Sequence, residues 1–252
     1  PPAPHPPRQS AGPNGRKSLR RWFMEPCHVP PHRPEYRRQK KDGPDYREVN
    51  GQAILRRAAE VAAAGMHGLL LTGSAGTGKT MIARRIPTIL PGLTREEDIE
   101  ISRIYSICGL LPPGRPLLSE RPFRSPHHTI TARALAGGGV PPRPGELSLA
   151  SGGVLFLDEL PHFGRSAVEI LRQPLEERKI TVTRVSGNYE FPADFMMVAA
   201  MNLCPCGFYP DRNRCNCTEN QIRRYLGHIS RPILERVDIC AQAAPVTFGE
   251  LN

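Results

Sequence analysis

Residues 73–80 read GSAGTGKT and directly follow the apolar run 68–72. The pattern G-x-x-x-x-G-K-S/T, after a strand-like segment and before a helix-like one, is typical of a phosphate-binding loop. Glycines let the backbone wrap close to phosphate oxygens, so that consecutive N–H groups and a helix N-terminus face the anion. The predicted nucleotide-binding residues are Gly73, Ser74, Ala75, Gly76, Thr77, Gly78, Lys79 and Thr80. A plain glycine-rich turn is the alternative, and the preceding strand and the Gly-Lys-Thr ending count against it.

Two side chains of this loop carry distinct chemistry. Lys79 is expected to reach the β- and γ-phosphates, and Thr80 to hold Mg²⁺ through its hydroxyl. Asp158 and Glu159 come directly after the apolar run 154–157, at the carboxyl end of a predicted strand, where ligands gather in open α/β sheets. Asp158 is suited to bind the Mg²⁺ of the nucleotide through water, and Glu159 to orient or deprotonate the attacking water. The alternative is a pair of acids that only caps a strand or helix.

Asn202 and Arg236 are candidates to complete the site. Asn202 ends the strand predicted over 195–201, where its neutral amide is able to hydrogen-bond the attacking water or the γ-phosphate; taken alone, it reads as a turn residue. Arg236 could supply positive charge to the transition state from a neighbouring subunit. Beside Glu235 and Asp238, it also reads as a member of a surface ion pair.

Four cysteines form the pattern C-x-C-x₈-C-x-C: Cys204, Cys206, Cys215 and Cys217. Four thiols this close suit a tetrahedral, structural Zn²⁺; free thiols or a redox pair are the alternatives. We expect Cys108 and Cys240 to be core residues. His127 and His128 are adjacent and should point apart, so shared metal ligation is not expected; a polar loop near phosphate or a subunit boundary, with Arg121 and Arg124, is favoured.

Helical and strand patterns alternate along the chain, which predicts a parallel α/β sheet covered on both faces. Predicted helices cover 52–64 (with Gly65 as C-cap), 79–90 (kinked or shortened by Pro87), 94–108, 165–177 and 218–226. Predicted strands cover 68–72, 154–157 and 195–201, with a hairpin of 179–185 and 189–191. The Gly/Pro-rich segment 112–153 is long for a plain loop and is expected to carry function or small elements of its own.

The net charge of +10 is concentrated at one end of the chain. Residues 1–41 hold ten Lys and Arg and two acids, and residues 1–44 hold 11 of the 28 prolines. We therefore expect residues 1–44 to form a disordered basic tail, which either touches nucleic acid or is only a solvated leader. Residues 45–252 are expected to form the nucleotide-binding core, with a zinc-like loop at 203–217. Neither a membrane span nor a secretory signal is evident, and we expect a cytoplasmic chain without a membrane partner.

Beyond these patterns, the run from Tyr46 to Val246 resembles the magnesium-chelatase-like AAA+ ATPases of the YifB/ComM type. The matching stretches are GSAGTGKTMIARRIPTILPGL, ERPFRSPHHTI, GGGVPPRPGELSLASGGVLFLDELPHF, LRQPLEERKITVTR, FMMVAAMNLCPCGFYPD and ISRPILERVDI. The resemblance implies an AAA+ P-loop NTPase core with a hairpin inserted at about Lys179–Phe191 and another insertion before the strand at 154–157. It also implies assembly into a ring, expected to be a homo-hexamer. By position, it makes Lys79 and Thr80 the Walker A residues, Asp158 and Glu159 the Walker B residues, Asn202 sensor 1, Arg236 the arginine finger, and Gly51-Gln52 the adenine-side pair.

Members of the ComM type resemble DNA translocases that drive branch migration during natural transformation, so we expect Mg²⁺-dependent ATP hydrolysis by a motor acting on DNA. Arg172, Lys179 and Arg184 are candidates to grip the DNA backbone. The alternatives are a chelatase-like ATPase subunit that remodels a protein partner and a nucleotide-binding fragment without turnover.

The sequence departs from the family pattern in three places. Arg231 and Glu235 stand where Gly and Asp are expected, which affects the turn before Arg236. The Lon-like N-terminal domain and the helical lid of the family are not recognised in this sequence, so we expect a partial protein.

Overall fold

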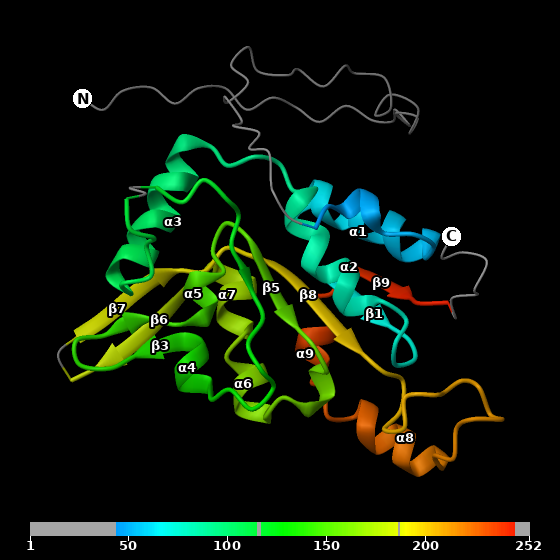
Figure 1. Cartoon of the computed structure of the whole chain (residues 1–252). Helices are drawn as coiled ribbons and strands as arrows, with labels where there is room; N and C mark the ends of the chain where they lie inside the picture. Colours follow the sequence, from blue (N-terminus) through cyan, green and yellow to red (C-terminus); the bar gives the residue numbers. More distant parts are fainter. Residues whose placement is uncertain (1–43, 115–116, 186, 245–252) are drawn as a thin grey trace, which may run out of the picture. The chain divides into compact units, whose positions relative to one another are not determined.

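The computed structural model describes residues 44–114, 117–185 and 187–244 (Figure 1). The predicted basic tail, residues 1–44, lies outside the described residues except for Pro44. None of the helices in the described part of the chain combines the length and apolar character needed to span a bilayer.

A five-stranded parallel sheet forms the centre of the fold, in the order β2-β5-β8-β1-β9 (Figure 1). Its strands are β1 (Leu69–Thr72), β2 (Phe123–Arg124), β5 (Val154–Leu157), β8 (Met196–Met201) and β9 (Ile239–Gln242). Leu69 pairs with Val198 of β8 on one side and with Ile239 of β9 on the other. Every residue of β1, β5 and β8 is buried, because a parallel sheet is covered on both faces. The predicted parallel α/β fold is confirmed, with β2 and β9 as edge strands that the sequence patterns did not indicate.

Helices connect the strands and cover the sheet. The α-helices of the described residues are α1 (Ala53–Gly65), α2 (Lys79–Arg85), α3 (Arg95–Ile107), α4 (Ala132–Ala136), α5 (Glu146–Leu149), α6 (Arg165–Glu169), α7 (Arg172–Glu177), α8 (Glu219–Leu226) and α9 (Arg231–Leu234). Short 3₁₀ turns lie at η2 (Tyr46–Glu48), η3 (Ile86–Thr88) and η4 (Leu160–His162).

Successive strand residues point to opposite faces of the sheet, and this alternation gives two apolar cores. On one face, Leu69, Leu71 and Phe156 pack with residues of α1 and α2. On the other face, Leu70 and Leu157 pack with residues of α4, α5 and α6 (Figure 1). The two layers of helices hold the strands in register and fix the carboxyl edge of the sheet, where β1, β5 and β8 end.

Helix boundaries follow local signals in most places. Predicted capping boxes are present at Thr94, which opens α3, and at Thr218, which opens α8. Helix α2 ends at Arg85, before Pro87, which has no N–H to continue the ladder, so the predicted shortening of this helix is confirmed. Two expectations were wrong. Helix α1 ends on Met66 in the left-handed conformation (φ 54°), with Gly65 still helical.

The second wrong expectation is the single helix over 165–177, which is two helices, α6 and α7. The break falls at Ile170 and Leu171. Pro174 explains the break, because in a continuous helix its ring would clash with the carbonyl group of Ile170, four residues earlier. The chain therefore turns before α7 and leads into the hairpin that follows.

Two β-hairpins project from the helical layers. The segment 112–153 carries small elements, as predicted: β2, α4, β3 (Gly137–Gly138), β4 (Arg143–Pro144) and α5. The predicted hairpin after α7 is confirmed as β6 (Lys179–Arg184) paired with β7 (Gly187–Pro192). The two hairpins are neighbours, because a Cβ on Gly138 would collide with the guanidinium of Arg184.

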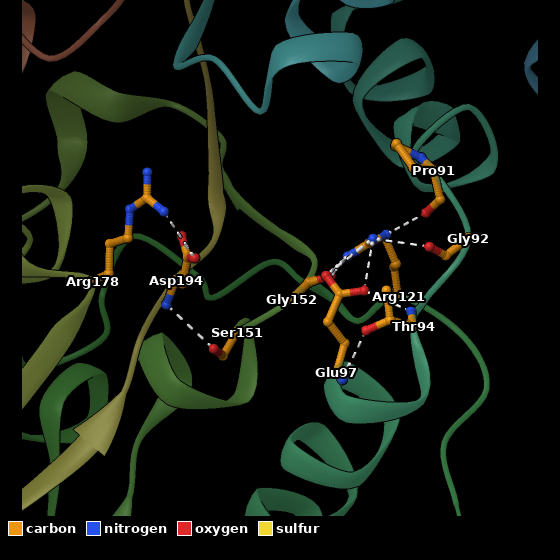
Figure 2. A network of polar contacts seen from close by, with 9 residues as sticks. All are labelled: Pro91, Gly92, Thr94, Glu97, Arg121, Ser151, Gly152, Arg178 and Asp194. Atoms are coloured by element: carbon orange, nitrogen blue, oxygen red, sulfur yellow. Dashed lines mark hydrogen bonds and ion pairs between the residues drawn. The ribbon is translucent and has the colours of Figure 1, made fainter. Parts of the chain in front are cut away.

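Arg121 holds backbone carbonyls and Glu97 within the fold, which corrects the first of its two predicted places, a loop near phosphate. Its side chain is only 8% exposed and donates to the carbonyl oxygens of Pro91 and Gly152, each at 2.6 Å. It also pairs with Glu97 at 3.3 Å (Figure 2). Arg124 in turn holds Glu146 with two bonds of 2.6 Å. Arg121 therefore fastens the inserted segment 112–153 to residues 91–97, and Arg124 ties β2 to α5 within that segment.

Candidate nucleotide-binding site

The predicted phosphate loop joins the end of β1 to the start of α2. Gly73, Gly76 and Gly78 all have positive φ (145°, 77° and 84°), which side chains rarely adopt. A Cβ on Gly73 would also lie 2.7 Å from the Cβ of Ala243, which follows β9. The loop therefore needs its glycines both for its curvature and for its close approach to the next strand.

Lys79 lies folded over this loop. Its side chain is buried, and Nζ donates to the carbonyl oxygens of Gly73 (2.8 Å) and Ser74 (2.7 Å) and to Oδ1 of Asn202 (3.2 Å). Burial lowers the pKa of Lys79, and the nearby Asp158 carboxylate opposes that effect. The ammonium is thus held at the mouth of the loop by acceptors that an anionic phosphate is able to replace.

Thr80 and Asp158 are brought together from different elements. The Thr80 hydroxyl at the start of α2 donates to Oδ2 of Asp158, just beyond β5, at 2.8 Å. The other carboxylate oxygen accepts from the backbone N–H of Glu159 at 3.0 Å. A hydroxyl and a carboxylate at this edge supply the oxygen ligands that Mg²⁺ takes beside bound phosphates.

Glu159 has an unusual backbone and two histidine neighbours. Its φ of 54° lies in the left-handed region, a strained conformation that clusters at functional sites. Its Oε2 is 3.3 Å from Nδ1 of His128 and 3.4 Å from Nδ1 of His162. The sequence patterns did not indicate either contact, because His128 comes from the inserted segment and His162 from η4.

The two adjacent histidines do not point apart as expected. The rings of His127 and His128 are 4.1 Å apart between centroids, and both belong to one irregular loop rather than to a helix or strand. Only His128 reaches the carboxylate of Glu159; Nδ1 of His127 pairs with the Thr129 hydroxyl at 2.9 Å. His128 is therefore a neighbour of the predicted catalytic glutamate, whereas His127 pairs with a residue of its own loop.

Asn202 follows β8, between the phosphate loop and the strand that leads to Asp158. Its Oδ1 accepts the Lys79 hydrogen bond, so four of the predicted site residues, with Thr80 and Asp158, converge on the carboxyl edge of the sheet. Tyr225 of α8 lies against the Asn202 backbone, and burial raises the pKa of Tyr225 to about 12. A neutral phenol therefore packs behind Asn202.

Arg236 lies where the strands β1 and β9 begin, at the opposite end of the sheet from the phosphate loop. Its carbonyl oxygen contacts Gly68, which precedes β1, whereas the phosphate loop follows β1. The Arg236 guanidinium pairs with Glu176 of α7 at 2.8 Å and lines a pocket that also contains Gly68 and Arg121. Within one copy of the chain, Arg236 is thus a surface ion-pair member that is not brought to Lys79.

The other residues singled out in the sequence, the adenine-side pair and the basic residues before and in the β6–β7 hairpin, have partners of their own. Gln52, in the predicted adenine-side pair, exchanges two hydrogen bonds with the backbone of Ala244, beyond β9. Of the basic residues predicted to grip DNA, Arg172 pairs with Glu176 and Lys179 with Glu190, while Arg184 donates to the Thr183 carbonyl.

The four cysteines of the predicted zinc-like loop gather in one place. Their Sγ atoms all lie within 4.8 Å of one another, with Cys204 and Cys215 buried. A backbone hydrogen bond from Phe208 lowers the pKa of Cys206 to about 6. This arrangement is able to hold one metal ion. In contrast, the expectation that Cys108 and Cys240 are core residues was wrong: Cys108 is half-buried and Cys240 is exposed on the edge strand β9.

The sheet order, the inserted hairpins and the loop between β1 and α2 define an α/β P-loop core of the AAA+ type. A family model described as "Magnesium chelatase, subunit ChlI" matches residues 45–251. The chain therefore belongs to this family, which confirms the resemblance of its sequence motifs.

Relatives of the chain include proteins from several bacteria. The uncharacterized protein Rv2897c of Mycobacterium tuberculosis is 47% identical over 209 residues, which cover 82% of this chain and 41% of that protein. The competence protein ComM of Haemophilus influenzae is 43% identical over 208 residues, covering 82% and 40%. YifB of Escherichia coli is 46% identical over 195 residues, covering 77% and 38%. The chain thus spans about two-fifths of the length of these relatives.

Among solved structures, NtrX from Brucella abortus in complex with ATP is 19% identical, with a TM-score of 0.48. The match covers 77% of this chain and 38% of NtrX.

Proposed function

We propose that residues 45–252 form the ATP-hydrolysing core of a ring-forming, Mg²⁺-dependent AAA+ motor. The observation that carries the proposal is the convergence of Lys79, Thr80, Asp158 and Asn202 at the carboxyl ends of β1, β5 and β8. These groups come from segments up to 123 residues apart and meet where a parallel sheet binds its ligands.

Each residue has a role in phosphoryl transfer to water. The loop N–H groups and Lys79 bind the phosphates, and Lys79 exchanges its loop carbonyls for the β- and γ-phosphate oxygens. Thr80 and Asp158 hold Mg²⁺, which neutralises charge on the phosphates when bound. Glu159 takes the proton of the attacking water, and Asn202 orients that water or the γ-phosphate. Since the transition state is charged and loose, positioning and electrostatics supply most of the rate.

The position of Arg236 supports a site shared between copies. Arg236 precedes β9 and the phosphate loop follows β1, so the two lie at opposite ends of paired parallel strands. An arginine that acts on the γ-phosphate must then come from a neighbouring copy of the chain. A closed ring with head-to-tail contacts gives every phosphate loop such a neighbour. We propose a homo-hexamer.

DNA is the partner that we propose for the motor. The similarity to the competence protein ComM supports it, and so do the basic residues Arg172, Lys179 and Arg184 at and before the β6–β7 hairpin. A hairpin with cations is suited to follow a phosphate backbone.

A protein partner is the second candidate, and the hairpin tips favour it. Val185 at the tip of β6–β7 is fully exposed (111%), and Val140 at the tip of β3–β4 is 99% exposed. Because the two hairpins are adjacent, these valines lie on one side of the chain, where together they offer apolar area to a protein partner.

The cysteine loop, residues 203–217, is proposed to bind one structural Zn²⁺ through Cys204, Cys206, Cys215 and Cys217. Four thiolates fill a tetrahedral zinc site and leave no open position for catalysis.

Steady-state ATP turnover tests the proposal, measured with Mg²⁺ in the presence and absence of DNA. We expect turnover that DNA stimulates and that Glu159→Gln lowers by about a hundredfold while ATP binding remains, because general-base catalysis contributes a factor of that order. Stimulation by a protein partner and not by DNA would favour the second candidate. ATP binding without turnover in the wild-type chain, at concentrations that permit assembly, would contradict the motor.

A further inference from the structure

We propose that the zinc-loaded cysteine loop forms the wall that fixes the phosphate loop and Asn202, so that zinc occupancy sets the affinity for ATP. The inference rests on the proposed function, in which ATP is the ligand of residues 73–80. The coupling itself is a separate claim, carried by contacts between the cysteine loop and the phosphate loop.

The spacing of the thiols matches a tetrahedral zinc ion. Sγ of Cys204 lies 3.3 Å from that of Cys206 and 3.8 Å from that of Cys215, and the latter two are 3.6 Å apart. With Zn–S bonds of about 2.3 Å, the sulfurs of a tetrahedral site are about 3.8 Å apart, whereas a disulfide needs about 2.05 Å. The observed distances therefore match shared ligation and exclude a covalent pair.

The loop also supplies an outer hydrogen bond to the ligand set. The backbone N–H of Tyr209 donates to Sγ of the fully buried Cys204 at 3.3 Å. Donors of this kind orient metal ligands and tune their affinity. The Tyr209 N–H therefore fixes the position of the Cys204 sulfur inside the loop.

In this proposal, a bound ion supplies much of the order of this segment. In the described chain, residues 203–217 contain turns but no helix or strand. The small apolar cluster beneath them consists of Cys204, Cys215 and Ile222, with Phe208, Tyr209, Cys217 and Leu226 packed against it. Two of its three buried members are thus ligands themselves, and without the ion little apolar area holds the loop closed. In such a case the free energy of metal binding is the free energy of folding the loop.

The same loop touches the nucleotide site at two points. Asn202, which accepts the Lys79 hydrogen bond, is only two residues before the ligand Cys204. The turn that begins at Cys204 closes at Gly207, whose N–H donates to the Cys204 carbonyl at 3.1 Å. A Cβ on Gly207 would lie 3.5 Å from Nδ2 of Asn202 and 3.7 Å from the backbone N of Ala75. The Cys204–Gly207 turn therefore packs on the backbone of the phosphate loop and on the amide that faces Lys79.

Chelation of the full chain tests the proposal directly. Metal content is measured by mass spectrometry, and affinity for a fluorescent ATP analogue is measured before chelation, after chelation and after Zn²⁺ is added back. We expect about one zinc per chain, a loss of nucleotide affinity of about tenfold on removal, within the usual range of coupling between sites, and recovery on addition. Cys217→Ser should reproduce the chelated state, and Cys108→Ser, outside the cluster, should leave zinc content and affinity unchanged.

A variant of the turn separates the coupling from the ion. Gly207→Asn adds a side chain against Ala75 and Asn202 and tolerates the φ of 81° better than other residues, and we expect it to keep zinc and to lose nucleotide affinity. Absence of zinc, or iron in its place, would overturn the metal assignment. Bound zinc whose removal leaves nucleotide affinity unchanged would overturn the coupling. A zinc-loaded chain that binds no ATP would instead contradict the proposed function, with the zinc site intact.

Discussion

The hydroxyl of Thr80 lies 2.8 Å from Oδ2 of Asp158 and donates to it, joining the first turn of α2 to the residue after β5. The bond links two segments 78 residues apart in the chain. It places one hydroxyl and one carboxylate together at the carboxyl edge of the sheet. The proposed contact of these two groups with Mg²⁺ is testable by substitution of Thr80.

Removal of the Thr80 hydroxyl should weaken the effect of Mg²⁺ on nucleotide binding. In the wild-type chain we expect Mg²⁺ to increase the affinity for ATP. In Thr80→Val the increase should fall by about tenfold, the factor that corresponds to about 1.4 kcal/mol of lost coordination. Thr80→Ser keeps the hydroxyl and should behave as wild type. Titrations of ATP with and without Mg²⁺ measure this, and equal Mg²⁺ dependence in all three chains would count against the assignment.

His128 should act as a positioning residue for Glu159. Its Nδ1 is 3.3 Å from the Glu159 carboxylate, so we expect His128→Ala to lower kcat by about tenfold, since misplacement of a catalytic group is costly. The KM for ATP and the melting temperature should change little. His128→Asn places a side-chain amide near the position of Nδ1 and should restore part of the rate.

His127 provides the matched control for this prediction. Its ring packs against that of His128 but pairs with Thr129, so His127→Ala should lower kcat less than His128→Ala. Equal losses in the two variants, or a loss in KM alone, would show that the loop and not the His128 contact matters.

Arg121 should contribute to stability rather than to catalysis. Its guanidinium is buried among the Pro91 and Gly152 carbonyls and Glu97, so Arg121→Met leaves these acceptors without their donor (Figure 2). We expect a loss of about 3 kcal/mol in the free energy of unfolding.

Arg178→Met is the control for this prediction, because the Arg178 side chain is 76% exposed in its pair with Asp194 (Figure 2). An exposed ion pair of this kind contributes less than about 1 kcal/mol. Chemical denaturation of both variants measures the difference. Similar losses of unfolding free energy in the two variants would show that the buried Arg121 network stabilises the fold no more than an exposed ion pair does.

Local patterns in the sequence predicted much of the fold. The apolar runs at β1, β5 and β8 and the capping box at Thr94 are signals carried by neighbouring residues, and the structure has these elements where the sequence indicates them. The edge strand β9 was missed because its four residues become a strand only by pairing with β1. The division of α6 from α7 was missed although Pro174 carried the signal.

Contacts between distant segments were harder to foresee. His128 and Glu159 are 31 residues apart, and no spacing rule links a loop histidine with a strand-end glutamate. The structural role of Arg121 depends on carbonyl groups, which leave no mark in the sequence. Single cysteines such as Cys240 were misjudged for a similar reason: residue type indicates burial on average, but the position of an edge strand decides it.

The central claim is that ATP is hydrolysed at sites shared between copies of the chain, with Lys79 from one copy and Arg236 from its neighbour. Chains that carry Lys79→Ala or Arg236→Ala should each be nearly inactive alone. In a mixed ring, an Arg236→Ala copy supplies an intact phosphate loop and an adjacent Lys79→Ala copy supplies the arginine. With random assembly of equal amounts, about a quarter of the interfaces are then complete.

The most direct test is the ATP turnover of this mixture, compared with a mixture of Lys79→Ala and Glu159→Gln chains, in which both changes fall on the same side of the interface. The account predicts that activity returns in the first mixture and not in the second. No recovery in the first mixture, or full activity of Arg236→Ala alone, would contradict it.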